Sequence, residues 1–115
     1  MLRIINEEMS EAYMEIISKL SDMIDEELED AEKYAKCAMK YKTEKPVLAD
    51  LFYKLSLEEM NHMSMLHQQA VSMIEEYRRT NGEPPEKMLF LYDYLHRKHQ
   101  EHAIQVKAMQ TVYKG

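Results

Sequence analysis

Glycine and proline are scarce in this chain of 115 residues, which has two glycines and three prolines. Few positions therefore interrupt a helix. The five glycine and proline residues are Pro46, Gly82, Pro84, Pro85 and Gly115. The uninterrupted stretches are rich in Glu, Lys, Leu, Met and Ala, which favour helix. We expect an all-α chain with three long helices near residues 7–42, 47–80 and 86–113, and fraying at residues 1–6.

Cysteine is also nearly absent. Cys37 is the one cysteine, so an internal disulfide is impossible and no Cys-x-x-Cys pair exists for a zinc ribbon or a rubredoxin-type site. We expect Cys37 to be inert packing. A single free thiol fits a reducing compartment. Arg3 is followed by Glu7 and Glu8 before any apolar segment, which is unlike a secretory signal. We expect a cytoplasmic protein.

An excess of positive charge is missing as well. There are 21 acidic residues against 15 basic ones, for a net charge of -6. Nucleic acid is therefore not an expected partner, because neutralising phosphates needs a basic face. No apolar run approaches the roughly 18 residues of a membrane-spanning helix, so we expect no membrane partner. A hydrophobic content of 45% argues against disorder.

Apolar residues recur three and four positions apart in each stretch, as in the seam of an antiparallel bundle. Both connections are short, so neighbouring helices should run antiparallel within a single domain, residues 1–115. The stripes are Tyr13, Ile17, Leu20, Ile24, Ala31, Tyr34 or Ala35, and Ala38; then Leu48, Phe52, Leu55, Leu66, Ala70, Met73 and Tyr77; then Met88, Tyr92, Leu95, Val106, Met109 and Tyr113. The eleven methionines are expected to fill gaps in this core.

Ionisable residues occupy the gaps in these stripes, namely Glu27, Glu59, His62, His99 and His102. Burying an unpaired charge is costly, so ionisable residues at seam positions indicate that something compensates their charge. Counted outward from the two turns, at about 1.5 Å per residue, all five fall within about one or two helical turns of a common plane. Polar seam residues on three helices at one height predict a shared site.

Carboxylates and imidazoles together are typical ligands of transition metals. Glu59 and His62 are three residues apart, so both project from one helix face towards a common ion. Such a Glu-x-x-His unit, facing a Glu of a neighbouring helix, is the building block of di-iron carboxylate bundles. We predict one or two iron ions as the cofactor, with manganese or zinc as alternatives.

In two stretches the sequence resembles the ferritin-like superfamily, most closely its rubrerythrin-type and bacterioferritin-type helices. The first is Glu26-Glu27-Leu28 with Ala31 and Tyr34, in which Tyr follows the ligand Glu by seven residues. The second is Phe52, Ser56 and Glu59-Met60-Asn61-His62-Met63. The resemblance covers roughly residues 20–77. It implies metal ligation by Glu27, Glu59 and His62, a bridging role for Glu59, and Tyr34 close to the site.

The chain departs from this family in one respect that matters. Family members with a complete site in one chain have four helices and a second Glu-x-x-His, whereas the third stretch here offers only His96, His99, Glu101 and His102. Either two chains pair, as short encapsulated-ferritin-like proteins do, to give a four-helix bundle as a homodimer or larger oligomer, or His99 and His102 complete the site within one chain. Oxidation of ferrous ions, or reduction of oxygen or peroxide, is the implied oxidoreductase activity. Rubredoxin cysteines for a full rubrerythrin are absent.

Several alternatives remain open. Glu27 could belong to a solvated face, Glu59 and His62 to a buried ion pair, and His99 and His102 to a polar face. Glu58 is the nearest competitor of Glu59, and His67 and His96 are expected to be solvated. At the level of function, the chain could be a metal-free helical interaction module. It could also hold structural zinc through Glu59, His62, His99 and His102.

Overall fold

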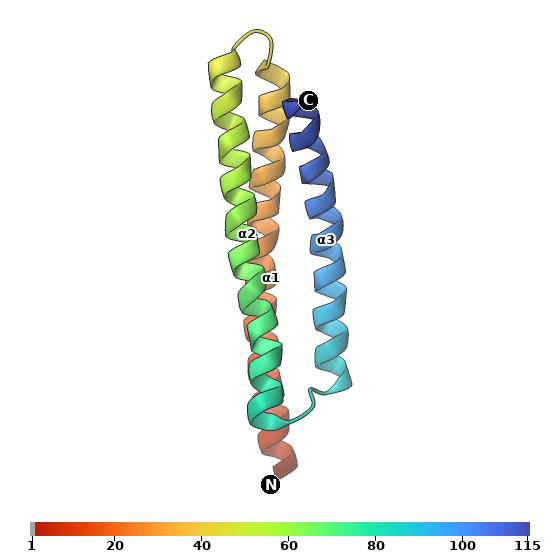
Figure 1. The fold of residues 1–115 in the computed structure, drawn as a ribbon. Helices are drawn as coiled ribbons and strands as arrows, with labels where there is room; N and C mark the ends of the chain where they lie inside the picture. The colour runs from red at the N-terminus through yellow and green to blue at the C-terminus, as the bar shows by residue number, and fades with distance from the viewer. Residues whose placement is uncertain (1) are drawn as a thin grey trace.

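Three long helices make up the computed structural model, which describes the backbone of residues 2–115 and the side chains of residues 7–115. They are α1 (Leu2–Tyr41), α2 (Pro46–Asn81) and α3 (Glu86–Lys114). The prediction of three helices is confirmed, although α1 begins at Leu2 rather than near residue 7. The helices run up, down and up in a rod of 66 × 17 × 17 Å, with the chain termini at opposite ends (Figure 1).

Proline and glycine define the turns, as the sequence predicts. Pro46 is the first residue of α2, where its missing N–H costs nothing and its fixed φ suits a helix. At the other end of α2, Gly82 adopts φ 87°, and its backbone N–H donates to the Arg78 carbonyl at 3.2 Å. Pro85 precedes α3 and its carbonyl accepts the N–H of Met88 at 3.0 Å. Each break therefore closes a helix end with a backbone hydrogen bond.

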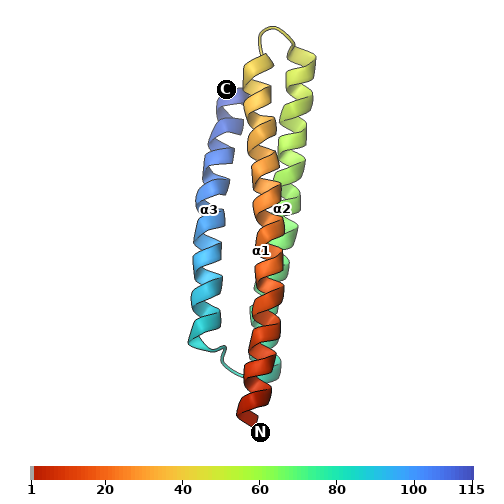
Figure 2. The same ribbon diagram turned by 180° about the vertical axis from the view of Figure 1, so that it is seen from behind.

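α1 is the central helix of the bundle. It packs extensively against α2 and less extensively against α3, whereas α2 and α3 have little contact with each other. Figure 2 shows α3 running alongside α1, and buried residues of α3 such as Val106 and Tyr113 join the core. Small buried residues allow α1 and α2 to approach closely over the half of the bundle nearest their connecting turn. These are Ala31, Ala35, Ala38, Ala49 and Ser56.

A buried chain of hydrogen bonds joins the three helices. The Ser56 hydroxyl of α2 donates to the Ala31 carbonyl of α1 at 2.7 Å. The Gln110 side-chain amide of α3 donates in turn to the Ser56 oxygen at 2.8 Å. Both side chains are more than 90% buried. This chain satisfies polar groups in a dry environment and so fixes the heights of the helices relative to one another.

The central core line in α1 and α2 differs from the one expected. Leu28 is 0% exposed and Met60 is 8% exposed, so these residues fill the steps that the predicted stripes gave to Glu27 and Glu59. The two glutamates are only partly buried. Each is next in sequence to a core residue, and about 100° per residue around a helix turns it towards the edge of the α1–α2 interface.

Over the described residues, none of the helices combines the length and the apolar character needed to cross a lipid bilayer.

Candidate metal centre

Glu27 of α1 and Glu59 and His62 of α2 meet at the edge of the α1–α2 interface. Each offers a ligand atom, and these atoms lie within 4.8 Å of one another. The His62 Nδ1 atom is 3.4 Å from Glu27 Oε2 and 3.8 Å from Glu59 Oε2. In the described part of the chain, this is the one group of three or more such residues close enough to share an ion. The structure therefore brings together three of the five predicted site residues, and their binding of a metal stays a prediction.

The Glu27 carboxyl group makes ionisation of the Glu59 carboxyl group less favourable. A hydrogen bond with Glu27, burial of the carboxyl group and the negative charge of Glu27 together raise the pKa of Glu59 to about 7, against the opposing influence of His62. Asp30 adds to the increase. Two carboxylates this close resist ionising together, so Glu59 holds its proton more tightly. A cation between them would remove that repulsion.

The Glu27 Oε2 atom gives a second reason to expect a cation at this site. The atom is shielded from solvent, yet it accepts no hydrogen bond in the structure. A buried acceptor without a donor is unfavourable unless a proton or a cation satisfies it. Two carboxylates and one imidazole are a donor set that suits iron, manganese or zinc. The residues present therefore fit a transition-metal ion.

One chain supplies only three of the ligands that such an ion takes. A closed structural zinc site needs four protein ligands, and iron in carboxylate bundles needs more. The His62 side chain is 51% exposed, whereas those of Glu27 and Glu59 are 26% and 19% exposed. The site therefore faces outward at the imidazole, and further ligands would come from water or from another molecule. Glu58, the nearest competitor of Glu59, is exposed.

Tyr34 lies on the same side of α1 as Glu27, seven residues along. Its ring stacks on Phe52 of α2, with the ring centroids 6.2 Å apart. Phe52 also stacks on Tyr41, at 6.3 Å. The aromatic rings therefore pack along the α1–α2 interface from the level of Tyr34 to the end of α1. The contact of the Tyr34 ring is thus with Phe52 of the neighbouring helix.

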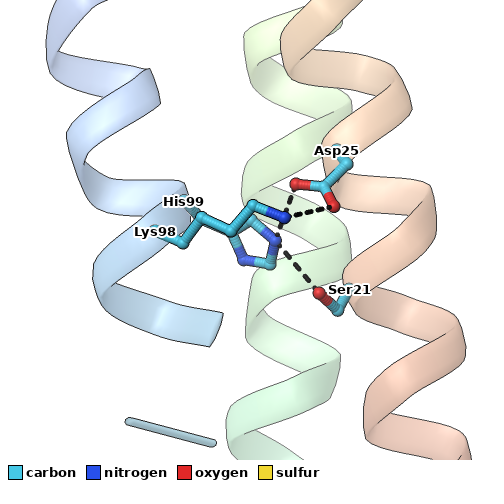
Figure 3. A network of polar contacts seen from close by, with 4 residues as sticks. All are labelled: Ser21, Asp25, Lys98 and His99. Carbon is cyan, nitrogen blue, oxygen red and sulfur yellow. Dashed lines mark hydrogen bonds and ion pairs between the residues drawn. The ribbon is translucent and has the colours of Figure 1, made fainter. Parts of the chain in front are cut away.

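The structure does not bring His99 and His102 into this group. His99 Nε2 lies 3.1 Å from Asp25 Oδ1 and 3.2 Å from the Ser21 hydroxyl (Figure 3). His102 Nε2 lies 3.6 Å from Glu32 Oε1. Asp25 and Glu27 are two residues apart, so they point about 200° apart around α1. The α3 histidines face one side of α1 and the Glu27 group faces the other.

The contacts around His99 resemble a Ser–His–Asp arrangement only in composition. Ser21 and Asp25 approach the same ring nitrogen, Nε2 (Figure 3). A nucleophilic triad needs the carboxylate on one ring nitrogen and the hydroxyl on the other, so that the ring moves a proton between them. Lys98 also pairs with Asp25, at 3.4 Å. This network therefore fastens α3 to α1 and does not activate Ser21.

Sequence reasoning missed the partners of the α3 histidines. Ser21, Asp25 and Glu32 lie among many charged residues on α1, and nothing in their own spacing distinguishes them. Their spacing of four and then seven residues does place them on one helix face. Had the side of α1 that faces α3 been known, that spacing would have identified them. Counting residues from the turns predicts that the five side chains lie near one plane across the bundle. It does not predict which side of α1 each of them faces.

Comparisons of the chain with protein-family models, with curated proteins and with solved structures found no match.

Proposed function

We propose that this protein binds a transition-metal ion, iron before manganese or zinc, through Glu27, Glu59 and His62. The convergence of these three side chains from two helices is the observation that carries the proposal. The enclosed Glu27 Oε2 atom, which accepts no hydrogen bond, supports it, because a cation satisfies that atom. The ferritin-like resemblance of residues 20–77 makes the same proposal from the sequence.

Each ligand has a distinct role in this proposal. Glu59 and Glu27 supply hard oxygen donors that suit both oxidation states of iron. His62, three residues after Glu59 on α2, supplies an imidazole and fixes the geometry of the site. Bound iron would supply the redox chemistry, with ferrous ion and oxygen or peroxide as the reactants. The chain's own contribution is to hold the ligands on rigid helices.

We further propose that two chains pair across the open side of the α1–α2 interface, so that two half-sites of three ligands meet. Exposed apolar residues on that side support this pairing. Ile16 and Met23 precede Glu27 by eleven and four residues, and Leu51 precedes His62 by eleven, spacings that keep them on the ligand side of each helix. The exposed apolar residues of this side are Met9, Ile16, Met23, Leu48, Leu51 and Met65.

The total surface area also supports a partner. The chain exposes 7878 Å², whereas a folded monomer of 13.7 kDa is expected to expose about 6,600 Å². The excess is of the size that one chain buries in an ordinary protein interface, about 800 Å² or more. In the paired arrangement, α1 and α2 of both chains would form a four-helix bundle around the ligands.

Metal content tests the proposed site. We expect the purified protein, supplied with ferrous ion under anaerobic conditions and then desalted, to retain iron by mass spectrometry of the metal. Glu59→Gln and His62→Ala should lose that iron, because each removes one of three ligands. Glu58→Gln is the matched control: it removes a neighbouring, exposed carboxylate and should bind iron as the unmodified chain does.

Two results would contradict the proposal. One is a protein that stays metal-free after exposure to iron, manganese and zinc. The other is equal iron retention in Glu58→Gln, Glu59→Gln and His62→Ala. Thermal unfolding gives a second readout, since an ion that binds only the folded state raises the melting temperature.

The alternative of structural zinc at Glu59, His62, His99 and His102 gains no support within one chain, because the two α3 histidines face the opposite side of α1. The metal-free interaction module has one observation in its favour. The outer face of α3 exposes Phe90, Tyr94, Ile104 and Val112, and that face takes no part in the metal centre. The metal-retention experiment separates these alternatives.

A further inference from the structure

A second cluster of imidazoles lies between α2 and α3, away from the metal centre. The rings of His67 on α2 and His96 on α3 are stacked, with centroids 4.7 Å apart and planes inclined by 20°. Tyr92 stacks on the other side of the contact, 5.9 Å from His96 and nearly parallel to it. The expectation that His67 and His96 are solvated is wrong, because both are partly buried. α2 and α3 pack less extensively than the other helix pairs. They also meet through the Gln110–Ser56 hydrogen bond and the Tyr53–Tyr113 ring stack, so the His67–His96 stack is one of a small number of links between them.

The rings line a small cavity with apolar walls. Its volume of about 10 Å³ is room for a single water molecule. Besides His67, Tyr92, His96 and His99, the lining residues are Ile17, Ser21, Ile24, Ala70 and Leu95. His96 Nδ1 is enclosed and has no hydrogen-bond partner. A proton on this enclosed nitrogen would lack a hydrogen-bond acceptor to stabilise it.

This cluster is not built to hold a metal ion. Nearly parallel stacked rings direct their nitrogen lone pairs along separate planes, so they do not converge on one point. Within the described residues, the one group whose ligand atoms converge is that of Glu27, Glu59 and His62. What the stack does provide is two titratable rings in contact, one from each helix.

We propose that the stacked rings of His67 and His96 form an acid-sensitive latch, which holds α3 against α2 at their own level of the bundle when the rings are neutral and opens that part of the contact when they gain protons. The proposal concerns the α2–α3 contact alone and does not depend on the metal centre.

Among the described residues, the two stacked imidazole rings have no carboxylate partner, whereas carboxylates lie near the neighbouring Tyr92 ring. His67 faces His96, and within the described side chains no carboxylate pairs with either ring. Burial first, and the neighbouring His96 second, lower the pKa of His67. Tyr92, the third ring, faces Asp93 of its own helix and Glu75 of α2. Two imidazolium rings stacked at this distance would repel each other with no anion between them.

The contact between α3 and α1 responds differently. His99 is 5% exposed and faces Asp25 of α1, Lys98 of its own helix and His67 of α2. Burial lowers the pKa of His99 despite the opposing influence of Asp25. Once protonated, however, this ring keeps a carboxylate at 3.1 Å. Acid therefore weakens the contact of α3 with α2 more than its contact with α1, because His99, unlike His67 and His96, keeps a carboxylate partner when it is charged.

The direction of the pH effect follows from these shifts. A histidine with a lowered pKa in the closed state binds a proton more readily once the helices separate. Separation is therefore favoured as the pH falls below about 6.5, the ordinary histidine value. Above that pH His67 is neutral and the latch stays closed.

Distances between spin labels test the latch. In a Cys37→Ser background, Ser64→Cys with Gln100→Cys reports the α2–α3 distance, and Asp22→Cys with Gln100→Cys reports the α1–α3 distance; all three positions are exposed. When the pH is lowered from 8 to 5.5, we expect the α2–α3 distance distribution to shift to longer values and the α1–α3 distribution to stay unchanged.

Variants show whether the imidazoles cause the shift. His67→Phe with His96→Phe keeps two stacked rings but cannot titrate, so we expect no shift. If that variant does not fold, His67→Gln removes one of the two charges, and its shift should be smaller or need lower pH. His102→Gln is the control: it removes an α3 histidine that faces Glu32 of α1 and should respond as the parent protein does.

Three outcomes would overturn the latch. The first is an α2–α3 distance that does not change with pH in the parent protein. The second is an equal shift in the His67→Phe, His96→Phe variant or, where that variant fails to fold, in His67→Gln. The third is a simultaneous lengthening of both distances, which would mean that acid unfolds the bundle generally.

Discussion

Glu59 is where a proton and a metal ion would compete. With its pKa raised to about 7 by Glu27 and by burial, this carboxyl group is about half protonated at neutral pH. A metal ion needs it ionised, so binding should displace the proton. In the metal-free protein, the same shift makes the contribution of Glu59 to stability largest below pH 4.5, with its loss complete as the pH rises through about 7.

Titration calorimetry in buffers of different ionisation enthalpy tests this competition. At pH 7 we expect about half a proton to be released from Glu59 for each ion bound, and nearly none at pH 8.5, where the group is already ionised. The pH 8.5 measurement on the same protein is the control. Binding heats at pH 7 that do not depend on the buffer would contradict the prediction.

The choice between neighbouring residues was the hardest part to predict from the sequence. Glu27 and Leu28 both fit a spacing of three and four from other apolar residues, and so do Glu59 and Met60. The structure gives the core positions to Leu28 and Met60 and leaves the glutamates at the edge. The buried faces of α1 and α2 are wide enough to hold two parallel rows of residues. The sequence alone does not say which row lies at the centre of the interface and which lies at its edge.

Ser56 sets the register of the elements that carry the ligands. It lies three residues before Glu59 on α2, and it bonds to the carbonyl of Ala31, four residues after Glu27 on α1. A slip of one residue, about 1.5 Å along either helix, would break this bond. The two carboxylates are therefore brought to one height by a neutral hydrogen bond about one turn away.

Ser56→Ala should weaken this register. It leaves the buried Gln110 amide without its partner, at a cost of about 1–3 kcal/mol, and it removes the cross-helix bond to the Ala31 carbonyl. We expect urea denaturation to show that loss, and iron affinity to fall although no ligand is changed. Thr111→Ala is the control, because its hydroxyl bonds only within α3 and is exposed. Unchanged stability in Ser56→Ala would refute the assignment.

Helix number and boundaries were predictable because proline and glycine are so few. Pro46 and Pro85 begin or precede helices, and Gly82 ends one with a positive φ. The arrangement of α3 was less predictable. A three-helix chain can place its third helix in contact with both others or with one, and the seam of α3 does not distinguish these choices. For that reason His99 was assigned correctly to a buried seam but to the wrong neighbours.

The whole molecule is a thin rod. Its radius of gyration is 18.0 Å, whereas a compact domain of this length has about 13 Å. A rod has much surface for its volume, and the apolar residues beside the metal centre form part of that surface. Pairing of two chains along this side would bury them and would leave the outer face of α3 free.

Charged substitutions on this side test the pairing. Met23→Lys and Leu51→Lys, at exposed positions, should change the stability of a single chain by no more than about 0.5 kcal/mol. They should nevertheless convert a dimer to a monomer in light scattering coupled to gel filtration. Phe90→Lys, on the exposed outer face of α3, is the control and should stay dimeric. A monomeric parent protein, or a dimer lost only in Phe90→Lys, would show that this pairing is wrong.

An odd number of helices has a mechanical consequence. Because the chain crosses its own length three times, Leu2 and Gly115 lie at opposite ends of a body 66 Å long (Figure 1). Two fluorophores or two fused domains attached to these ends would be held apart by a stiff spacer. Energy transfer between end-attached dyes would report whether the folded chain keeps this length.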